Sequence, residues 1–409
     1  MAGTVDGAKS ASVECHPPLP KKAKPSKRPA IREKVQSEAI VDAPPYFTEN
    51  GLRKVRPYWF HYHVFAKQRW FGKPLAQVLE KELYSSFPGF FASAIKAGRV
   101  TVNNELVCPE YEVQNGDLIR HMCHRHELPV LDRGVTIIEN TDNLLVVDKP
   151  CSLPIHPCGR YHFNSLIQFL KYSFGFDNLK ILYRLDRLTS GLVVFLKNAE
   201  TEKRFRQQLV NSDIRKEYLC LVEGEFPDGE LTCDQPLDHL FRSMGLMRVS
   251  KEGKPCFSRF RKLHSDGKSS IVKCFPETGR THQIRVHLQF LGYPIVDDAI
   301  YNCDVFGPSK GKNGDYGKPI EELEQDVRRR FSMDNWLDHG NPPLVQGERK
   351  KGDESEPADC ELCRMKFRDP SISELQMSLH CLRYSGPDWT YECSLPPWAS
   401  VLKENKIEF

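Results

Sequence analysis

The stretch YRLDRLTSGLVVFLKN, residues 183–198, places a charged cluster directly before an apolar run. The apolar half has the length and composition of a buried strand. The charged half sets Asp186 between Arg184 and Arg187. A carboxylate beside guanidinium groups stays ionised at neutral pH, so it is a poor general acid but an available nucleophile or anionic base. Alone, the pattern indicates only a structural ion pair at a strand entrance, and other segments must decide between these interpretations.

Two further segments place reactive side chains beside expected secondary structure. DKPCSLPIHPCGRYHFNSL, residues 148–166, has the pattern of a strand end, a proline-stiffened loop and a helix start. In KEYLCLVEG, residues 216–224, Lys216 and Tyr218 are two positions apart. Because side chains alternate along a strand, we expect both to lie on one face.

A fourth segment, FPETGRTHQIRVHLQFLGYPIVDDAIY, spans residues 275–301. Arg285 follows Thr281 by four residues. A helix that begins at Thr281 would carry both side chains on one face. The sequence therefore predicts that Arg285 points toward whatever Thr281 and His282 approach.

Taken in their order along the chain, the four segments resemble the RluA family of RNA pseudouridine synthases, over roughly residues 130–302. The tail LHCLRYSGPDWTYECSLPPWA resembles the eukaryotic branch, which includes fungal enzymes that act on position 32 of tRNA. Four ordered motifs make the resemblance specific. It implies a pseudouridine synthase fold and the isomerisation of uridine to pseudouridine in RNA. Reactant and product are isomers, so no cofactor is expected.

The resemblance implies a role for each matching residue. Asp186 is implied as the nucleophile, Arg285 as its ion-pair partner, and Tyr218 as the ring that stacks on the flipped uracil. Arg184 is implied to displace the target base. Other motif residues are expected to bind substrate: Arg187, Thr189, His156, Lys149, Thr281, His282 and Ile284. Tyr183 departs from the family motif, which usually opens with His, so we expect a changed substrate fit and no loss of activity.

The order of predicted elements favours an α+β fold with a mixed, mostly antiparallel central sheet. Strands and helices do not alternate strictly, which argues against a doubly wound parallel sheet. Strands are expected at 135–139, 144–150, 191–198, 217–226, 255–263 and 269–276. Helices are expected at 164–174, 199–211 and 281–292.

An N-terminal unit is predicted before this core. Residues 72–96 show two helical patterns, and a hairpin is expected to turn at Asn103-Asn104 before a further strand that ends near residue 120. The order of helix, helix and small strands resembles the S4 RNA-binding domain over about residues 72–120. A generic small α+β cap is the alternative.

The length of 409 residues allows two domains or one large domain with additions, and the cysteines indicate a reducing compartment. The 14 cysteines follow no disulfide spacing, and the chain shows neither a secretory signal nor an apolar run long enough for a membrane span. The expected division is a disordered basic tail (1–45), the aromatic-rich segment with the S4-like domain (46–125), the synthase core (126–302), a partly disordered insertion (303–358) and a C-terminal completion of the core (359–409).

Net charge is only +4, so RNA contact has to come from local basic runs. Residues 242–262 hold seven Lys/Arg against one acid and are expected to contact phosphates, with a solvated hairpin as the alternative. The motif PLPKKAKPSKRP in the tail is interpreted as a solvated tail, an import signal or an RNA-binding arm. We expect a nuclear or cytoplasmic protein, with mitochondria left open.

Two rival interpretations remain from the sequence. Cys360-x-x-Cys363, together with His380 and Cys381, has a spacing compatible with zinc, but no metal ligand is assigned. A non-catalytic RNA-binding protein on the same scaffold is the functional alternative. The expected partner is RNA, with tRNA ahead of mRNA, bound by a monomer that has no membrane association.

Overall fold

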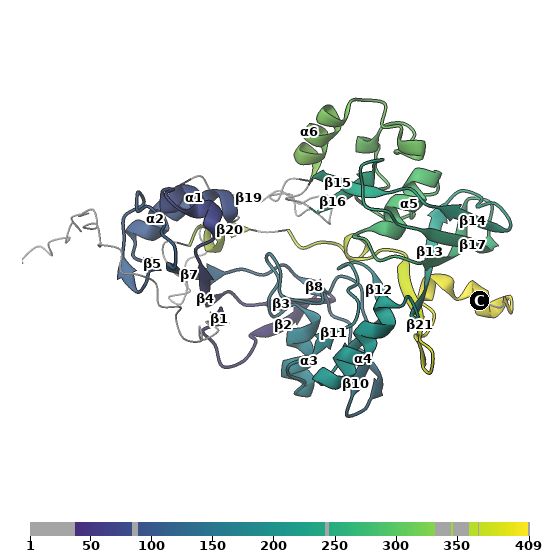
Figure 1. The fold of residues 1–409 in the computed structure, drawn as a ribbon, viewed down its shortest axis with the longest axis horizontal. Coiled ribbons are helices and arrows are strands. Elements are labelled where there is room, and N and C mark those ends of the chain that lie inside the picture. Colours follow the sequence, from purple (N-terminus) through teal and green to yellow (C-terminus); the bar gives the residue numbers. More distant parts are fainter. Residues whose placement is uncertain are drawn as a thin grey trace, which may run out of the picture. The chain divides into compact units, whose positions relative to one another are not determined.

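The computed structural model describes residues 37–83, 89–241, 245–331, 345–346, 360–366 and 368–407 (Figure 1). Most of the expected basic tail and much of the expected insertion lie outside these residues. The chain divides into two compact units. The first contains residues 57–125 with the strand near residue 38, and the second contains residues 43–56 and 126 onward. Within the described ranges, no helix has the length and apolar character that crossing a membrane requires.

The first unit is a five-stranded sheet with two short helices, in the order β1-β4-β7-β5-β6. Strand β4 (Tyr58–Phe65) pairs antiparallel with β7 (Leu118–Arg125) along its whole length. The remaining elements are β1 (Glu38–Ala39), β5 (Val100–Val102), β6 (Glu105–Leu106), α1 (Leu75–Glu82) and α2 (Phe90–Lys96). The aromatic-rich segment is thus a strand of this sheet.

The predicted hairpin at Asn103-Asn104 is confirmed. Both asparagines have positive φ, 52° and 70°, as the tight turn of a two-residue hairpin requires. The predicted spacing of α1 is also confirmed, because Leu75, Val78 and Leu79 are buried together. This apolar face and the buried face of α2 form the core of the first unit.

The second unit is built on a ten-stranded sheet whose main path is β14-β17-β18-β13-β21-β12-β10-β9. In this order the strands are Glu230–Cys233, Ser258–Ser265, Ser269–Pro276, Arg215–Glu223, Leu379–Ser385, Ser190–Leu196, Leu144–Lys149 and Thr136–Asn140, with β11 (Lys180–Ile181) beside β12 and β22 (Thr390–Glu392) beside β21. Among the described residues, β12 and β21 form the single parallel pair of this sheet. The predicted α+β fold with a mixed, mostly antiparallel sheet is confirmed.

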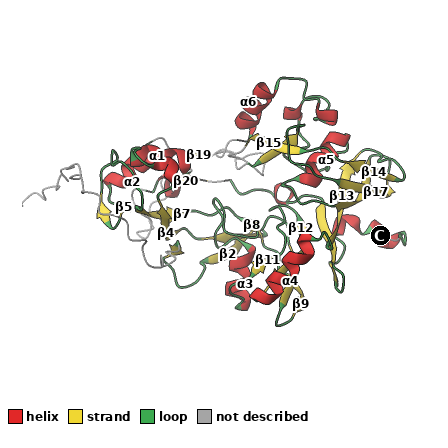
Figure 2. Ribbon diagram, viewed as in Figure 1, coloured by secondary structure: helices red, strands yellow, loops and turns green. Residues whose placement is uncertain are grey.

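Helices cover this sheet at separate places (Figure 2). Helix α4 (Ala199–Val210) packs against β12, and α5 (Gln283–Leu291) packs against β18. Helix α3 (Leu166–Phe174) follows the loop after β10. Asn198 caps α4 by accepting a hydrogen bond from the Thr201 backbone N–H at 2.9 Å, a standard way to satisfy the first turn. All three predicted helices are therefore present.

Helix α5 begins two residues later than the sequence predicts. His282 has a left-handed backbone with φ 55°, which ends the extended segment and leaves Thr281 outside the helix. Gln283 holds this start, because its side-chain oxygen accepts hydrogen bonds from the Arg280 N–H and the Thr278 hydroxyl. The expected helical face shared by Thr281 and Arg285 is wrong, although both residues face the same cavity.

The described segments also differ from the expected domain limits. The hairpin of β2 (Tyr46–Glu49) and β3 (Leu52–Val55) pairs with β8 (Val130–Leu131) and so belongs to the second unit. Residues 303–331, expected as part of an insertion, form short 3-10 turns and helix α6 (Ile320–Arg330). Leu323 and Val327 are fully buried in a core shared with the hairpin of β15 (Leu237–Phe241) and β16 (Leu246–Val249). The helix was not predicted because Gly, Lys and acidic residues dominate the segment and only a few apolar residues are buried.

Candidate active site

A cavity of ≈ 580 Å³ opens in the second unit beside the loop that precedes β12. Three segments form most of its wall: residues 154–158, residues 182–189 and residues 276–285. Ten of the eleven residues predicted for the site line it: Asp186, Tyr218, Arg285, Arg184, Arg187, Thr189, His156, Thr281, His282 and Ile284. Thr189 and Ile284 are buried in the wall, and Thr281 is exposed. The folded chain thus brings the four sequence motifs to one place.

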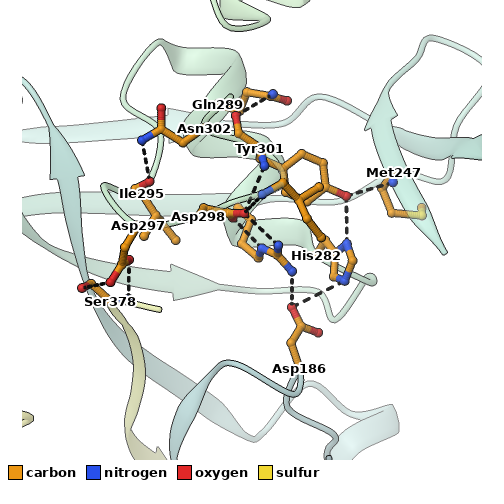
Figure 3. A network of polar contacts seen from close by, with 12 residues as sticks. Asp186, Met247, His282, Gln289, Ile295, Asp297, Asp298, Tyr301, Asn302 and Ser378 are labelled. Atoms are coloured by element: carbon orange, nitrogen blue, oxygen red, sulfur yellow. Dashed lines mark hydrogen bonds and ion pairs between the residues drawn. The ribbon is translucent and has the colours of Figure 1, made fainter. Parts of the chain in front are cut away.

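Among the residues that the structure describes, Asp186 is the one carboxylate on the cavity wall. Its side chain is 29% exposed, and its Oδ2 atom accepts a hydrogen bond from Arg285 Nη1 at 3.2 Å (Figure 3). The Nε2 atom of His282 lies 3.8 Å from the same oxygen. An anion is therefore held at a fixed position and remains open to a ligand in the cavity.

Arg285 is itself fixed from behind by a second carboxylate. Its Nε and Nη2 atoms donate to the two oxygens of Asp298 at 2.6 and 2.9 Å. Burial alone would lower the pKa of Arg285, but the negative charges of Asp298 and Asp186 raise it above its usual value. Burial would likewise raise the pKa of Asp298, and the charge and hydrogen bonds of Arg285 lower it. Both partners therefore stay ionised, and the Nη1 group of Arg285 remains available to Asp186.

Asp298 is in turn oriented by the backbone around Tyr301. Its Oδ1 atom accepts the N–H groups of Ile300 and Tyr301, each at 3.0 Å. The guanidinium of Arg285 stacks 4.9 Å from the centre of the Tyr301 ring. The aromatic face and the bidentate carboxylate together leave Arg285 little freedom to turn away from Asp186.

The Tyr301 hydroxyl connects this network to His282 (Figure 3). The hydroxyl oxygen accepts the Met247 backbone N–H at 2.9 Å and lies 2.8 Å from His282 Nδ1. The Nε2 atom of the same ring faces Asp186, so His282 links the Tyr301 hydroxyl to the carboxylate.

Strand β13 supplies another part of the wall. Lys216 and Tyr218 both line the cavity, so the predicted shared face is confirmed. The Tyr218 hydroxyl lies 3.2 Å from the Tyr384 hydroxyl, and burial raises the pKa of Tyr218, which keeps the phenol neutral. Lys216 Nζ donates to the Thr278 carbonyl at 3.1 Å and lies 4.6 Å from the Tyr183 ring centre. Burial lowers the pKa of Lys216 to about 8.

Positive charge dominates the cavity wall. Facing the single carboxylate are Arg184, Arg187, Lys216, Arg280 and Arg285. Arg184 is exposed, whereas Arg280 is held by two hydrogen bonds of 3.3 Å to the Pro255 carbonyl. Burial lowers the pKa of His156, and the charge of Arg184 lowers it further, so His156 is neutral at pH 7. The wall is suited to a polyanionic ligand with an uncharged group inserted among these side chains.

Lys149 differs from the other predicted residues because it does not line the cavity. It is fully buried, and its Nζ atom donates to the carbonyls of Pro150 (2.9 Å), Leu153 (2.9 Å) and Arg187 (3.1 Å). Burial lowers its pKa to about 7. Lys149 thus ties the proline-stiffened loop to the Arg184–Arg187 segment from behind the wall.

Sequence reasoning missed Asp298 and Tyr301, which support the cavity without lining it. Both belong to the quoted segment that ends in PIVDDAIY. A carboxylate inside such an apolar run is the signal that would have marked a buried ion pair. Its partner, Arg285, lies 13 residues earlier.

His380 and Cys381, which the sequence spacing grouped with Cys360 and Cys363, lie elsewhere in the structure. His380 lies on the central strand β21, where its Nδ1 atom is 2.9 Å from the Ser190 hydroxyl oxygen. Burial lowers its pKa to about 4. Cys381, also on β21, is fully buried in the main core. The combination of His380 and Cys381 with the Cys-x-x-Cys motif is therefore wrong.

Comparisons with known proteins agree with this geometry. A sequence model of the family described as RNA pseudouridylate synthase matches residues 143–290. Pseudouridylate synthase RPUSD2 of Mus musculus is 37% identical over 401 residues, covering 87% of this chain and 72% of the relative. RNA pseudouridine synthase 7 of Oryza sativa subsp. japonica is 38% identical over 369 residues, covering 87% and 92%. The mitochondrial tRNA pseudouridine(32) synthase of Saccharomyces cerevisiae is 36% identical over 379 residues, covering 88% and 78%.

These relatives are matched along most of their own length, and the family segment contains the motifs that meet at the cavity. The resemblance predicted from the sequence is confirmed. This chain belongs to the RNA pseudouridine synthases of the RluA type, a family of isomerases.

Proposed function

We propose that this pseudouridine synthase modifies uridine in tRNA with Asp186 as its nucleophile, as a monomer and without a cofactor. The observation that carries the proposal is the position of the Asp186 carboxylate, 3.2 Å from the fixed Arg285 guanidinium and open to the cavity. The reaction breaks the N–C glycosidic bond of uridine, turns the uracil and joins its C5 to the ribose C1′. Attack of Asp186 on C1′ and elimination through a glycal both require an ionised carboxylate at this position.

Other cavity residues are proposed to hold the everted nucleoside. Tyr218 offers a buried, neutral ring on which uracil stacks, close to the proton that leaves C5. Arg184 is exposed on the wall, so its side chain is free to enter the RNA stack in place of the base. Base flipping costs a few kcal/mol, and an inserted side chain offsets part of that cost. Arg187, Thr189, His156, Thr281, His282 and Ile284 complete the proposed substrate contacts.

The choice of tRNA rests on relatives. The yeast relative is named for position 32 of tRNA. No residue of the cavity wall argues for a nucleoside other than uridine. Messenger RNA is the second candidate. The same relative is named as mitochondrial, whereas the basic motif near residue 25 of this chain suggests nuclear import. Imaging of the tagged full chain, with and without Lys21→Ala/Lys22→Ala, tests a nuclear or cytoplasmic location.

The first unit is proposed to be an S4-like RNA-binding domain. Its order of two helices followed by small strands supports the likeness, and α1 and α2 each carry an exposed lysine in the last turn, Lys81 and Lys96. The double variant Lys81→Glu/Lys96→Glu should weaken RNA binding in a gel-shift assay. The double variant Lys403→Glu/Lys406→Glu, at two exposed lysines in and directly after the C-terminal helix α7 (Val401–Glu404), is the control of equal charge change.

The central test replaces the nucleophile. Asp186→Asn and Asp186→Ala should abolish pseudouridine formation in tRNA transcripts, measured by mass spectrometry of the digested RNA, while RNA binding is largely kept. Asp315→Asn, at an exposed carboxylate outside the cavity, should retain full activity. Activity in either Asp186 variant overturns the assignment. A wild-type chain that binds tRNA and mRNA but modifies neither favours the non-catalytic alternative.

A further inference from the structure

A compact group of sulfur and nitrogen atoms lies in the second unit, and none of its members lines the cavity. The Cys360 Sγ atom is 3.4 Å from His126 Nε2, and the Cys363 Sγ atom is 3.3 Å from the same nitrogen. Cys360 is 8% exposed, and Cys363 and His126 are half-buried. The three side chains therefore converge on one partly sheltered point.

Hydrogen bonding alone does not explain this convergence. One imidazole nitrogen carries either a lone pair or a proton, so it makes one good hydrogen bond. Here two sulfurs approach the same nitrogen at nearly equal distance. In tetrahedral zinc sites the Zn–N and Zn–S distances are about 2.0 and 2.3 Å, which separates N from S by roughly 3.5 Å. The observed contacts are close to that edge.

The types of ligand and their spacing select the metal. Two thiolates in Cys-x-x-Cys spacing with imidazole are typical of structural zinc, whereas calcium and magnesium prefer oxygen. The imidazole is that of His126, in the same unit as the two cysteines, and both sulfurs approach its Nε2 atom.

We propose that Cys360, Cys363 and His126 bind one structural Zn²⁺ ion. None of these three residues lines the cavity, so the ion is placed to hold the fold and not to act on a substrate there. Cys360 is 234 residues from His126, so the ion closes a long loop of the chain. It fastens the segment 360–366, which leads toward the central strand β21, to the residue that follows β7.

Metal content of the purified full chain is the first test. Protein made in zinc-supplemented medium, without chelating purification, should contain one zinc per chain by elemental analysis. Cys360→Ser, Cys363→Ser and His126→Ala should each raise the zinc Kd by more than about 100-fold, because loss of a group that merely orients a ligand already costs 10–100-fold. Cys108→Ser, at a half-buried cysteine outside the group, should keep the wild-type zinc content.

Cobalt gives a readout that does not depend on activity or on a folded variant. The wild-type chain loaded with Co²⁺ should show thiolate-to-cobalt absorption and the visible bands of a tetrahedral site, both lost on adding zinc. Bound zinc should also protect Cys360 and Cys363 from alkylation. Unchanged zinc affinity in His126→Ala overturns the site. Zinc retained by the Cys360→Ser/Cys363→Ser double variant, or a Cys360–Cys363 disulfide without metal in reducing buffer, overturns the proposal altogether.

Discussion

Asp298 shows how a residue outside the cavity governs the carboxylate inside it. Its two oxygens hold Arg285 at 2.6 and 2.9 Å, and Arg285 in turn holds Asp186 at 3.2 Å. Asp298 and Arg285 are 2% and 4% exposed. A buried pair of this kind contributes little net stability, but removal of one partner leaves an uncompensated charge in the interior. The pair is therefore best understood as a positioning device for Asp186.

Asp298→Asn should consequently lower both stability and turnover. Breaking a buried ion pair costs roughly 3–5 kcal/mol in the free energy of unfolding, and we expect the lower end because Asn keeps one acceptor. The kcat for pseudouridine formation should fall more than KM rises, since Arg285 loses its orientation before substrate binds. Urea denaturation and single-turnover assays measure the two effects. Asp326→Asn, at a half-buried ion pair with Lys318 outside the cavity, is the control expected to change neither. Wild-type stability in Asp298→Asn would contradict the account.

Lys216 predicts a pH limit to catalysis. Burial lowers its pKa to about 8, so the ammonium is protonated below pH 8 and neutral above it. Loss of this charge from the cavity wall weakens attraction for RNA, and kcat/KM should fall as pH rises through 8. Lys216→Arg keeps its charge at all accessible pH values, so the alkaline limb should disappear. A pH profile of kcat/KM from 6 to 10 checks this, and an unchanged limb in the Arg variant would exclude Lys216 as its cause.

The sequence motifs predicted the residues that line the cavity, but not the residues that hold them in position. Asp186, Arg285 and Tyr218 belong to short motifs whose order along the chain is visible in the sequence, and all three line the cavity. Lys149 belongs to the same kind of motif, yet its amine turns to three carbonyls. The direction of a side chain at a strand end depends on the loops packed around it, which no local pattern specifies.

At the scale of elements, the contact between β12 and β21 anchors the loop that carries Asp186. Gly191 lies on β12 opposite Cys381 of β21, with φ 106°. A Cβ atom at Gly191 would lie 2.2 Å from the Cys381 carbonyl oxygen, a distance at which the strands must separate. Cys381 is also the residue of β21 that pairs with Tyr218 of β13, so a shift would pass directly to Tyr218.

Gly191→Ala should therefore be strongly destabilising. A positive φ costs a residue with a Cβ about 1–3 kcal/mol, and overpacking adds about 1–3 kcal/mol. Thermal unfolding monitored by circular dichroism should show a large fall in Tm, with reduced activity at temperatures where the variant is still folded. Gly134→Ala is the matched control, because Gly134 has no left-handed φ and open space around its missing Cβ. Equal Tm values for the two variants would contradict the proposed close contact.

Elements marked by a local sequence pattern were predicted well, whereas elements held by contacts far away in the sequence were not. Strand β18 has the limits expected from the sequence, since its apolar run is bounded by turn residues. Strand β21 was not predicted, because it pairs with β12 and β13 from nearly 200 residues away and its sequence LHCLRYS has no clear alternation. The start of α5 was placed too early because His282 is held left-handed next to Tyr301, a contact across the fold.

For the whole molecule, the distribution of positive charge matters more than its sum. Net charge is +4, and much of the basic run 242–262 is neutralised. Lys262 pairs with Glu225 at 2.6 Å and Asp228 at 2.9 Å, and Arg259 pairs with Glu230 at 3.4 Å. The run is therefore not a uniform phosphate-binding surface, although the sequence suggested one.

Lys251 and Lys254 are two members of this run that lie close to the cavity wall. Both are exposed on the loop between β16 and β17, and in the part of the chain that the structure describes neither has an acidic partner within 4.0 Å. The neighbouring Pro255 carbonyl holds Arg280 of the cavity wall. These two lysines thus extend the cationic wall of the cavity outward, in the direction from which a polyanion approaches.

Neutralising these two lysines should change the salt dependence of tRNA binding. Each phosphate contact contributes about 0.7–0.9 to the slope of log Kobs against log salt, so Lys251→Gln/Lys254→Gln should reduce the slope by about 1.4–1.8. Fluorescence titrations with Asp186→Asn, which should bind without turnover, measure this slope between 50 and 300 mM salt. Lys262→Gln removes one positive charge that is already paired with acids, so the slope should stay at the value of the parent protein. If Lys262→Gln lowers the slope as much as one of the loop lysines does, the charge acts through the overall field of the protein and not through contacts beside the cavity.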